Sequence, residues 1–406
     1  METPVQTQSS SRARSITLTR YLDDLVKENP DLRQLESILL AIQMACKTIS
    51  NLVHRAGLVY SIANDSNVNA NNHSNTTTTT TTTTTTRRQD FTDGRFYSMQ
   101  RLDQLSTMVL QNALKYTGKL KVVTPVSHVS GECAQHQPGV LIAQALDSNY
   151  VACLDPLDGS GNADASICTG TVFGVFENPD KKEITSNSAS DDDATATSTP
   201  PTDAEQTQAL VESVLQPAKN MRAAGYCLYS SATVLVFTLG DTVQGFTLDP
   251  QINEFVLTHP NLTIPARGSV YSCNEGNSEG WDESYKTYLR KLKTGKGDTG
   301  QRYAHRYVGS MVGDIHRTLL YGGIFAYPAD SLSHPDGNLQ LLYKSAPMAF
   351  VVHHAGGKAI DGRTGSLLEV QPERVHQKSP CFMGSPEDVA ELERYLAKSV
   401  SEVTSR

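Results

Sequence analysis

Two long polar tracts limit which parts of this 406-residue chain can enter a folded core. One contains an unbroken threonine run at 76–86, and the other is a stretch rich in Asp, Ser and Thr at 183–206. Such segments have too few apolar side chains to offset the entropy lost on ordering, so they are expected to stay solvated. Sequence typical of a folded protein continues on both sides of each tract. We therefore predict a folded body with disordered insertions near 61–92 and 178–209.

Bulk composition argues against several classes of partner. The net charge is −8 and basic residues never form runs longer than a pair, which argues against a nucleic-acid groove or an anionic membrane surface. No apolar stretch is long enough to span a membrane. The seven cysteines are scattered without a C-x-x-C pair, a pattern typical of reduced thiols. We expect a cytoplasmic protein with no nucleic-acid and no membrane partner.

Helical and strand patterns alternate outside the polar tracts. Apolar residues recur every three or four positions over 31–56, and the segment 102–116 has a similar character, so two helices are predicted. Short apolar runs at 150–155 and 171–177 are typical of strands. Three further runs within 232–259 are separated by Gly-Asp and Asp-Pro turn signals and predict an antiparallel meander.

The C-terminal segment carries the signals of a helix start. Ser385 is expected as the N-cap, with Pro386 at the first helical position and Asp388 at the capping-box position. Mixed strands and helices together predict a layered α/β fold in which helix and sheet layers alternate. The predicted parts are a disordered tail (1–15), an N-terminal α+β domain (16–215) and a C-terminal α/β domain (216–400).

The segment “LDPLDGSGN” at 154–162 follows an apolar strand and carries the clearest chemistry. Asp155 and Asp158 lie three residues apart, separated by a rigid proline and by Leu157. The two carboxylates and the Leu157 carbonyl are oxygen ligands of the kind that hard divalent cations prefer. The segment therefore predicts a binding site for a divalent metal ion.

The residues after the aspartates suit a phosphate. Gly159 allows a close backbone approach, and the N–H groups from Ser160 onward can form an anion nest. Metal ions beside a bound phosphate are the arrangement of metal-assisted phosphoryl hydrolysis. The alternative is an ordinary surface turn, since Asp, Pro and Gly are turn residues.

Several long blocks in order identify a family that the chain resembles. From “SITLTRYL” to “ELERYLAKS” it is similar to class I fructose-1,6-bisphosphatase, and its second half is closer to plastid-type members, so a plastid is the alternative location. The resemblance implies a sugar-phosphatase fold with two mixed sheets, Mg²⁺ with Mn²⁺ as the alternative, a sugar bisphosphate and a tetramer. The matching blocks are “LDPLDGSGNADASICTGTVFGVFE”, “AAGYCLYSSATVLVFTLG”, “VYSCNEGN”, “RYVGSMVGDIHRTLLYGGIFAYPAD” and “APMAFVVHHAGGKAIDG”.

The resemblance also implies roles for individual residues. Asp103 and Glu132 match the pair that helps activate the attacking water. Asp155, Leu157 and Asp158 match metal ligands. The sugar and phosphate contacts would fall on Gly159, Ser160, Asn274, Arg306, Tyr307 and Tyr327.

The chain departs from the family pattern at the opposite wall of the site. Gly131 stands where a glutamate bridges the metals, and Lys344 stands where another glutamate is a ligand, so Glu132 becomes an alternative ligand. A loop aspartate is replaced by Tyr97, and the basic pair that holds the sugar and its phosphate by Asn338 and Gln340. One alternative is that the Lys344 ammonium replaces the charge of one metal ion and neutralises Asp155 or Asp158 directly.

Three readings of the function follow from these departures. The first is the family reaction, Mg²⁺-dependent hydrolysis of the 1-phosphate of fructose 1,6-bisphosphate, in weakened form. The second is a catalytically inactive paralogue that serves as a structural or regulatory subunit of a mixed tetramer. The third is a phosphatase with a shifted sugar-phosphate substrate. The substituted ligands favour the second reading, whereas the resemblance alone favours the first.

Overall fold

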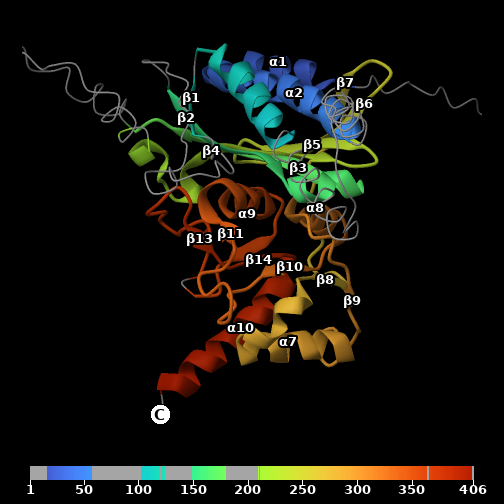
Figure 1. The fold of residues 1–406 in the computed structure, drawn as a ribbon, viewed down its shortest axis with the longest axis vertical. Helices are drawn as coiled ribbons and strands as arrows, with labels where there is room; N and C mark the ends of the chain where they lie inside the picture. The colour runs from blue at the N-terminus through green and yellow to red at the C-terminus, as the bar shows by residue number, and fades with distance from the viewer. Residues whose placement is uncertain are drawn as a thin grey trace, which may run out of the picture.

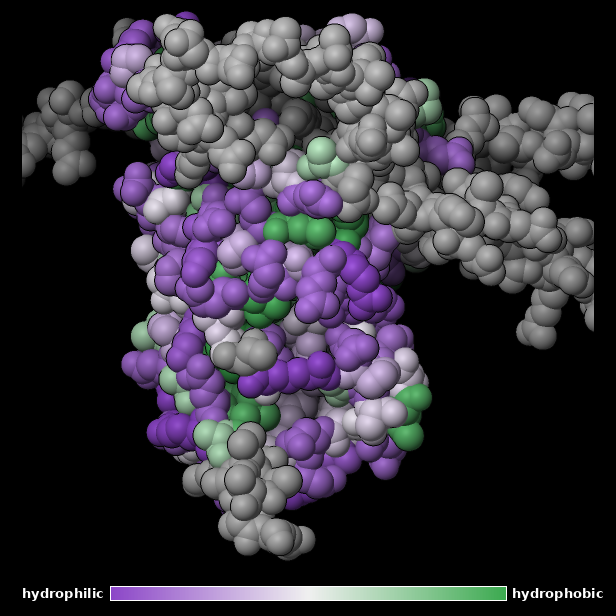
Figure 2. Space-filling model, turned by 90° about the vertical axis from the view of Figure 1, so that its left-hand side faces the viewer, coloured by the Kyte–Doolittle hydropathy of each residue, from purple (hydrophilic) through white to green (hydrophobic). Residues whose placement is uncertain are grey.

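The computed structural model describes most of the chain outside the polar tracts. The predicted tail and nearly all of both predicted insertions lie outside the described ranges. No helix within these ranges is long and apolar enough to cross a membrane. The face shown in Figure 2 is mostly hydrophilic, with hydrophobic residues in small separate areas. The described residues are 16–56, 102–118, 120–123, 149–179, 209, 211–363 and 365–404.

A seven-stranded sheet forms the upper half of the molecule (Figure 1). Its strands follow one another in chain order, with β1 and β2 parallel and all later neighbours antiparallel. The predicted meander is confirmed as β5, β6 and β7. The strands are β1 (Leu120–Val123), β2 (Tyr150–Asp158), β3 (Thr169–Glu177), β4 (Met221–Tyr229), β5 (Thr233–Thr238), β6 (Val243–Asp249) and β7 (Glu254–His259).

Helices cover the upper face of this sheet in Figure 1. They are α1 (Leu18–Glu28), α2 (Arg33–His54) and a helix at 102–115. Both predicted helices are thus confirmed, and the first begins two residues later than expected because a 3₁₀ turn (η1, Pro30–Leu32) precedes it. The apolar stripe of α2 is buried with residues of β3, β4 and β5 in one core cluster, so this helix layer is held by apolar packing.

A second helix layer separates the two main sheets. It consists of α8 (Met311–Tyr321) and α9 (Ala346–His354), which lie directly below the upper sheet (Figure 1). All side chains from Ala346 to Val352 are buried, as expected for a helix with a sheet on each side. Their core cluster contains residues of both sheets, so α9 joins the two halves into one packed body.

The lower sheet is also mixed, and it completes the layers. β10 is parallel to β8 and β8 to β9, whereas β14 is antiparallel to both of its neighbours. Helices α7 (Glu283–Thr294) and α10 (Pro386–Thr404) lie below it (Figure 1). The predicted alternation of helix and sheet layers is confirmed. The sheet order is β12 (Lys358–Ile360), β14 (Cys381–Gly384), β10 (Ile324–Tyr327), β8 (Val270–Ser272) and β9 (Ala304–His305).

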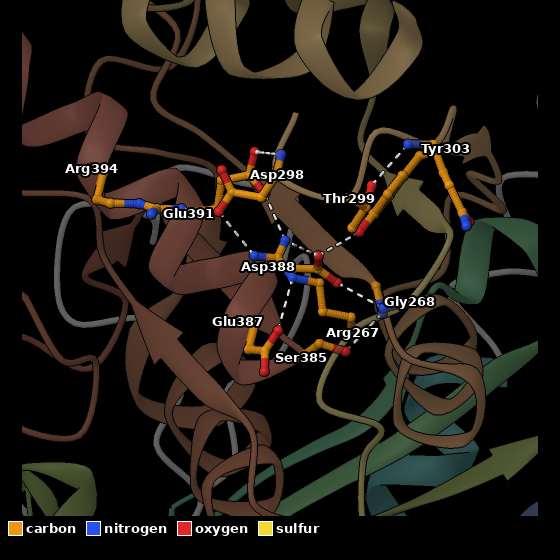
Figure 3. A network of polar contacts seen from close by, with 12 residues as sticks. Arg267, Gly268, Asp298, Thr299, Tyr303, Ser385, Glu387, Asp388, Glu391 and Arg394 are labelled. Carbon is orange, nitrogen blue, oxygen red and sulfur yellow. Dashed lines mark hydrogen bonds and ion pairs between the residues drawn. The ribbon is translucent and has the colours of Figure 1, made fainter. Parts of the chain in front are cut away.

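The start of α10 is held by a polar network rather than by a local capping box. The helix begins at Pro386 as predicted, but the Ser385 hydroxyl accepts from the Gly323 N–H at 2.9 Å. Asp388 accepts from the Gly268 N–H at 2.9 Å and from the Tyr303 hydroxyl at 2.6 Å (Figure 3). Ser385 is the N-cap by position, as predicted, because its carbonyl accepts from the Val389 N–H at 3.1 Å. The expected capping-box bonds are wrong, because partners from distant segments take up both side chains.

Arg267 is the cation at the centre of this network (Figure 3). Its guanidinium donates to Glu391 at 2.6 Å and to Asp388 at 3.1 Å, and both carboxylates are almost completely buried. It also contacts Asp298 at 3.1 Å and Glu387 at 3.0 Å. Since buried carboxylates need a partner, Arg267 ties the α10 start to the segment that enters the lower sheet.

The division of the chain at residues 215 and 216 stays a prediction. The upper sheet continues across this point, because β3 pairs with β4 from Thr169 opposite Tyr229 to Phe176 opposite Met221. The hydrogen-bonded strands thus connect residues on both sides of the predicted boundary.

Candidate functional site

The acidic corner, formed by Asp155 and Asp158, lies where the pairing of β2 with β3 changes register. Asp155 pairs with Val172, but Asp158 pairs with Gly170, so one extra residue is inserted on the β2 side. In a regular strand, residues three apart face opposite sides of the sheet. The bulge removes this alternation and lets both carboxylates face the same cation, as β-bulges near functional sites often do.

The bulge is fixed by contacts of its own. The Thr171 hydroxyl donates to the Pro156 carbonyl at 2.8 Å and lies 2.7 Å from the Tyr229 hydroxyl. Gly159 follows the corner with a φ of 72°, in the left-handed region that favours glycine. The corner is therefore rigid before any ligand is considered.

Lys344 reaches this corner from a π-helical turn, η6 (Leu341–Ser345). Its ammonium lies 2.8 Å from Asp155 Oδ2 and 2.7 Å from Asp158 Oδ1. The Cys153 thiol donates to the Leu342 carbonyl at 3.2 Å and so holds the turn against β2. Lys344 thus forms an ion pair with both aspartates, whereas the alternative drawn from the sequence had it neutralise one of the two.

The charges in the corner stabilise one another. Burial acts to lower the pKa of Lys344, but Asp155 and Asp158 outweigh it and hold that pKa well above its usual range. Burial raises the pKa of Asp155, and the neighbouring ammonium opposes this rise. Lys344 is therefore a permanent cation at physiological pH.

These residues do not fit a divalent metal ion. The corner that the resemblance assigns to a metal already holds the Lys344 ammonium within 2.8 Å of both carboxylates. A divalent ion about 4 Å from that ammonium would be repelled by roughly 8 kcal/mol at an effective dielectric of about 20. One internal cation pairs with both carboxylates, while Asp158 Oδ2 is buried without a hydrogen-bond partner among the described residues.

Asp103 lies on the other side of the corner, in the helix at 102–115. Its Oδ2 accepts from the Ser160 hydroxyl at 3.0 Å. Burial raises its pKa to about 7, the Ser160 hydrogen bond and Lys344 oppose the rise, and Asp155 adds to it. A carboxyl with this pKa can exchange a proton near neutral pH, as a general acid or base must.

The residues predicted for the sugar and phosphate lie toward the lower sheet. Tyr307 is half-buried, and burial raises its pKa to about 12, with Tyr327, Asp314 and Asp158 adding to the rise. The Tyr327 hydroxyl accepts from Asn338 Nδ2 at 3.3 Å. The Tyr307 side chain therefore lies within electrostatic range of both the Tyr327 ring and the acidic corner.

Two further predicted contacts lie on neighbouring segments. Asn274 caps the 3₁₀ turn η5 (Glu275–Gly280), and its Oδ1 accepts from the Gly276 N–H at 3.3 Å. The Arg306 side chain is exposed, while its backbone N–H donates to the Tyr271 carbonyl at 3.0 Å. Both keep polar groups available at the surface.

Asp314 is a positioning residue that the sequence reasoning missed. It is completely buried in α8, and its carboxylate accepts from the N–H groups of Val308 and Gly309 at 3.1 to 3.2 Å. The Arg317 guanidinium donates to it at 2.8 Å. These bonds shape the loop that follows Tyr307. No helix was predicted here from the sequence, and an acid in the first turn of a helix usually indicates no more than a favourable dipole.

A second group of candidate metal ligands lies beside Asn274. Ligand atoms of Cys273, Glu275 and His305 are all within 4.8 Å of one another. Glu275, however, already accepts from Lys293 at 2.6 Å and from a tyrosine hydroxyl at 2.7 Å. Burial raises the pKa of the Cys273 thiol to about 12, which disfavours the thiolate that a metal needs. This group is better explained by its internal bonds.

Several residues named from the sequence are outside the described ranges. They are Glu132, Gly131 and Tyr97, so the predicted partner of Asp103 and the predicted loss of a bridging glutamate stay predictions.

Protein-family models match most of the described residues, apart from the segment that contains α1 and α2. The model “Fructose-1-6-bisphosphatase, N-terminal domain” matches residues 94–260, and “Fructose-1-6-bisphosphatase, C-terminal domain” matches residues 264–397. The first match ends directly after β7, and the second includes the lower sheet.

Individual relatives agree with these models. A chloroplastic fructose-1,6-bisphosphatase of Pisum sativum is 38% identical over 396 residues, covering 98% of this chain and 87% of that protein. A cytosolic one of Oryza sativa subsp. indica is 37% identical over 389 residues, covering 95% and 96%. The chloroplastic and the cytosolic relative are thus similar to this chain at nearly the same sequence identity.

A solved structure shares the fold. The holo form of fructose-1,6-bisphosphatase from Leishmania major superimposes with a TM-score of 0.68 at 33% identity, covering 94% of this chain and 98% of that one. The apo form gives a TM-score of 0.69 at 34% identity.

Proposed function

The chain belongs to the fructose-1,6-bisphosphatase family, and on this premise we propose that it binds a sugar bisphosphate but hydrolyses it weakly or not at all. The family is one of phosphatases of carbohydrate metabolism, and it is metal-dependent as a rule. Its reaction would be hydrolysis of the 1-phosphate of fructose 1,6-bisphosphate.

The observation that carries the proposal is the position of Lys344. Its ammonium lies within 2.8 Å of both aspartates that would hold a metal ion. A metal in such a site, Mg²⁺ or alternatively Mn²⁺, supplies Lewis-acid activation of the phosphoryl group and of water. A lysine supplies neither, and losing about 3 kcal/mol of transition-state stabilisation lowers a rate roughly a hundredfold.

The rest of the site supports binding without turnover. Tyr307 and Tyr327 offer phenolic groups to a sugar phosphate, and Asp103 with Ser160 keeps a polar wall beside the corner. These side chains and the helices that position them do not depend on the cation in the corner. Ligand binding can therefore persist where turnover is lost.

The role that follows is that of a non-catalytic subunit. We infer a tetramer, built either from copies of this chain or with a catalytic relative, in which sugar bisphosphate binding has a structural or regulatory effect. The alternative, a phosphatase with a shifted sugar-phosphate substrate, is favoured by Asn338 and Gln340, which are neutral where the resemblance implies two cations. The compartment would be the cytoplasm or a plastid, as in the relatives.

Phosphate release from fructose 1,6-bisphosphate tests the proposal. We expect the wild type, in millimolar Mg²⁺ or Mn²⁺, to be about a hundredfold slower than the double variant Gly131→Glu with Lys344→Glu. Lys296→Glu is the control for charge, because it makes the same change at an exposed lysine after α7. Wild-type turnover at rates usual for enzymes would overturn the proposal.

A further inference from the structure

A short antiparallel ribbon lies close to Tyr327. It consists of β11 (Leu339–Gln340) and β13 (Lys378–Ser379), with Gln340 directly opposite Lys378. Cross-strand partners and residues two positions apart share a face of a ribbon. Asn338, Gln340 and Lys378 are therefore on one face, and Lys378 is the cationic member of the three.

Hydrogen bonds connect Lys378 to Tyr327 through one amide. The Lys378 ammonium donates to Asn338 Oδ1 at 3.0 Å, and Asn338 Nδ2 donates to the Tyr327 hydroxyl at 3.3 Å. The ammonium thus determines which end of the amide faces the phenol. Lys378 is otherwise exposed, so two of its three N–H groups remain available to a ligand or to water.

The turn before β11 keeps this arrangement in place. Gly337 has a φ of 78°, and a Cβ on it would clash with the backbone of Ser379 and Pro380. Such close backbone contact leaves no room for the two segments to shift relative to each other. Lys378 is therefore presented by a fixed element rather than by a loose loop.

A phosphate beside Tyr327 needs a cation that is not already held by carboxylates. Lys344 is held between Asp155 and Asp158 at 2.7 to 2.8 Å. The side chains of Tyr307, Tyr327 and Asn338 offer hydroxyl and amide groups but no positive charge. Arg306, the other predicted phosphate contact, is an exposed cation on the segment after β9, and among the described residues no hydrogen bond connects its side chain to Asn338 or Tyr327. A charge-assisted bond to phosphate is about twice as strong as a neutral one, so a nearby ammonium dominates recognition.

We propose that Lys378 supplies a phosphate-binding cation beside Tyr327. It acts from the neighbouring strand β13, in place of the two basic residues that the family resemblance implies at Asn338 and Gln340. The ligand group is a phosphate monoester on the far side of the sugar from Asp155 and Asp158. This inference rests on the proposed sugar-bisphosphate binding, which assigns the 1-phosphate to the acidic corner and the 6-phosphate to Lys378.

Calorimetric titration of the full-length protein tests the assignment with three sugar phosphates. We expect Lys378→Gln to weaken binding of fructose 1,6-bisphosphate and fructose 6-phosphate about tenfold, the loss of one charge-assisted hydrogen bond. Fructose 1-phosphate, which lacks the phosphate in question, should bind unchanged. Lys296→Gln, which removes an exposed lysine after α7, is the matched control and should leave all three affinities unchanged.

A rescue variant separates recognition from folding. Adding Asn338→Lys to Lys378→Gln returns a cation to the same face of the ribbon and should recover most of the lost affinity. Higher salt should reduce the difference between wild type and Lys378→Gln, because screening weakens an exposed charge. Unchanged fructose 6-phosphate affinity in Lys378→Gln, or equal weakening of fructose 1-phosphate, would overturn the role of Lys378. If the wild type binds none of the three sugars, the proposed function itself fails.

Discussion

Replacing Lys344 with methionine tests whether the internal cation stabilises the acidic corner. The side chains of Lys344, Asp155 and Asp158 are 18%, 12% and 6% exposed, so solvent screens their charges only weakly. Each contact is worth about 6 kcal/mol of Coulomb energy at an effective dielectric of about 20, and desolvation of the three groups cancels much of it. Breaking a buried pair from one side typically costs about 3–5 kcal/mol. We expect a loss of this size in the free energy of unfolding near neutral pH.

The pH dependence of this loss identifies its cause. The pKa of Lys344 is raised in the folded state, so its contribution is fully present below the unfolded pKa of the amine and is lost only in strong alkali. In Lys344→Met the two aspartates face each other without a cation and take up protons as the pH falls. The difference between variant and wild type should therefore shrink progressively in acid.

Urea unfolding followed by circular dichroism at several pH values measures both effects. Lys47→Met is the control, because Lys47 is also largely buried, at 8% exposed, but pairs with one partly exposed carboxylate, Glu254, at 3.0 Å. Its loss should be smaller and less dependent on pH. The reasoning is refuted if Lys344→Met is as stable as wild type near neutral pH, or if its destabilisation is the same in acid.

Three further outcomes are expected. Millimolar Mg²⁺ should raise the melting temperature of Lys344→Glu and leave that of the wild type unchanged in a thermal-shift assay, because the variant replaces the bound ammonium with a ligand. Asp103→Asn should flatten the pH dependence of the free energy of unfolding. Burial raises the pKa of Asp103 to about 7 in the folded protein. The stabilising contribution of Asp103 is therefore present below its unfolded pKa near 3.8 and is lost as the pH rises through about 7. Arg267→Met should lower the free energy of unfolding, measured in urea, by about 3–5 kcal/mol, because it leaves Asp388 and Glu391 buried without their cation. Arg267→Lys lacks the forked guanidinium and should recover only part of the lost free energy.

The elements that sequence patterns predicted best are those with strong local periodicity. The helix α2 and the β5–β7 meander were found because their apolar spacing and turn residues determine their own conformation. The start of α10 was placed correctly for the same reason. The roles of Ser385 and Asp388 were not, because their partners, Gly323 and Gly268, are far away in the sequence.

In the candidate site, too, local sequence features were predictable and contacts between distant segments were not. The segment around Asp155 and Asp158 and its family resemblance were visible in the sequence, and so was the change to Lys344. The register shift in β2 was not visible, although it explains how residues three apart can share one cation. The link from Lys378 through Asn338 to Tyr327 depends on strand pairing between short segments, which periodicity does not reveal.

The lysine between Asp155 and Asp158 differs from a metal ion in one further respect. A bound metal is in exchange with the surrounding solution, so its occupancy varies with the free concentration of that metal. An ammonium that is part of the chain is present at the same occupancy in every molecule. The charge of this corner is therefore set when the protein folds, and we expect its shape and its affinity for a sugar phosphate to stay constant while cellular magnesium rises and falls.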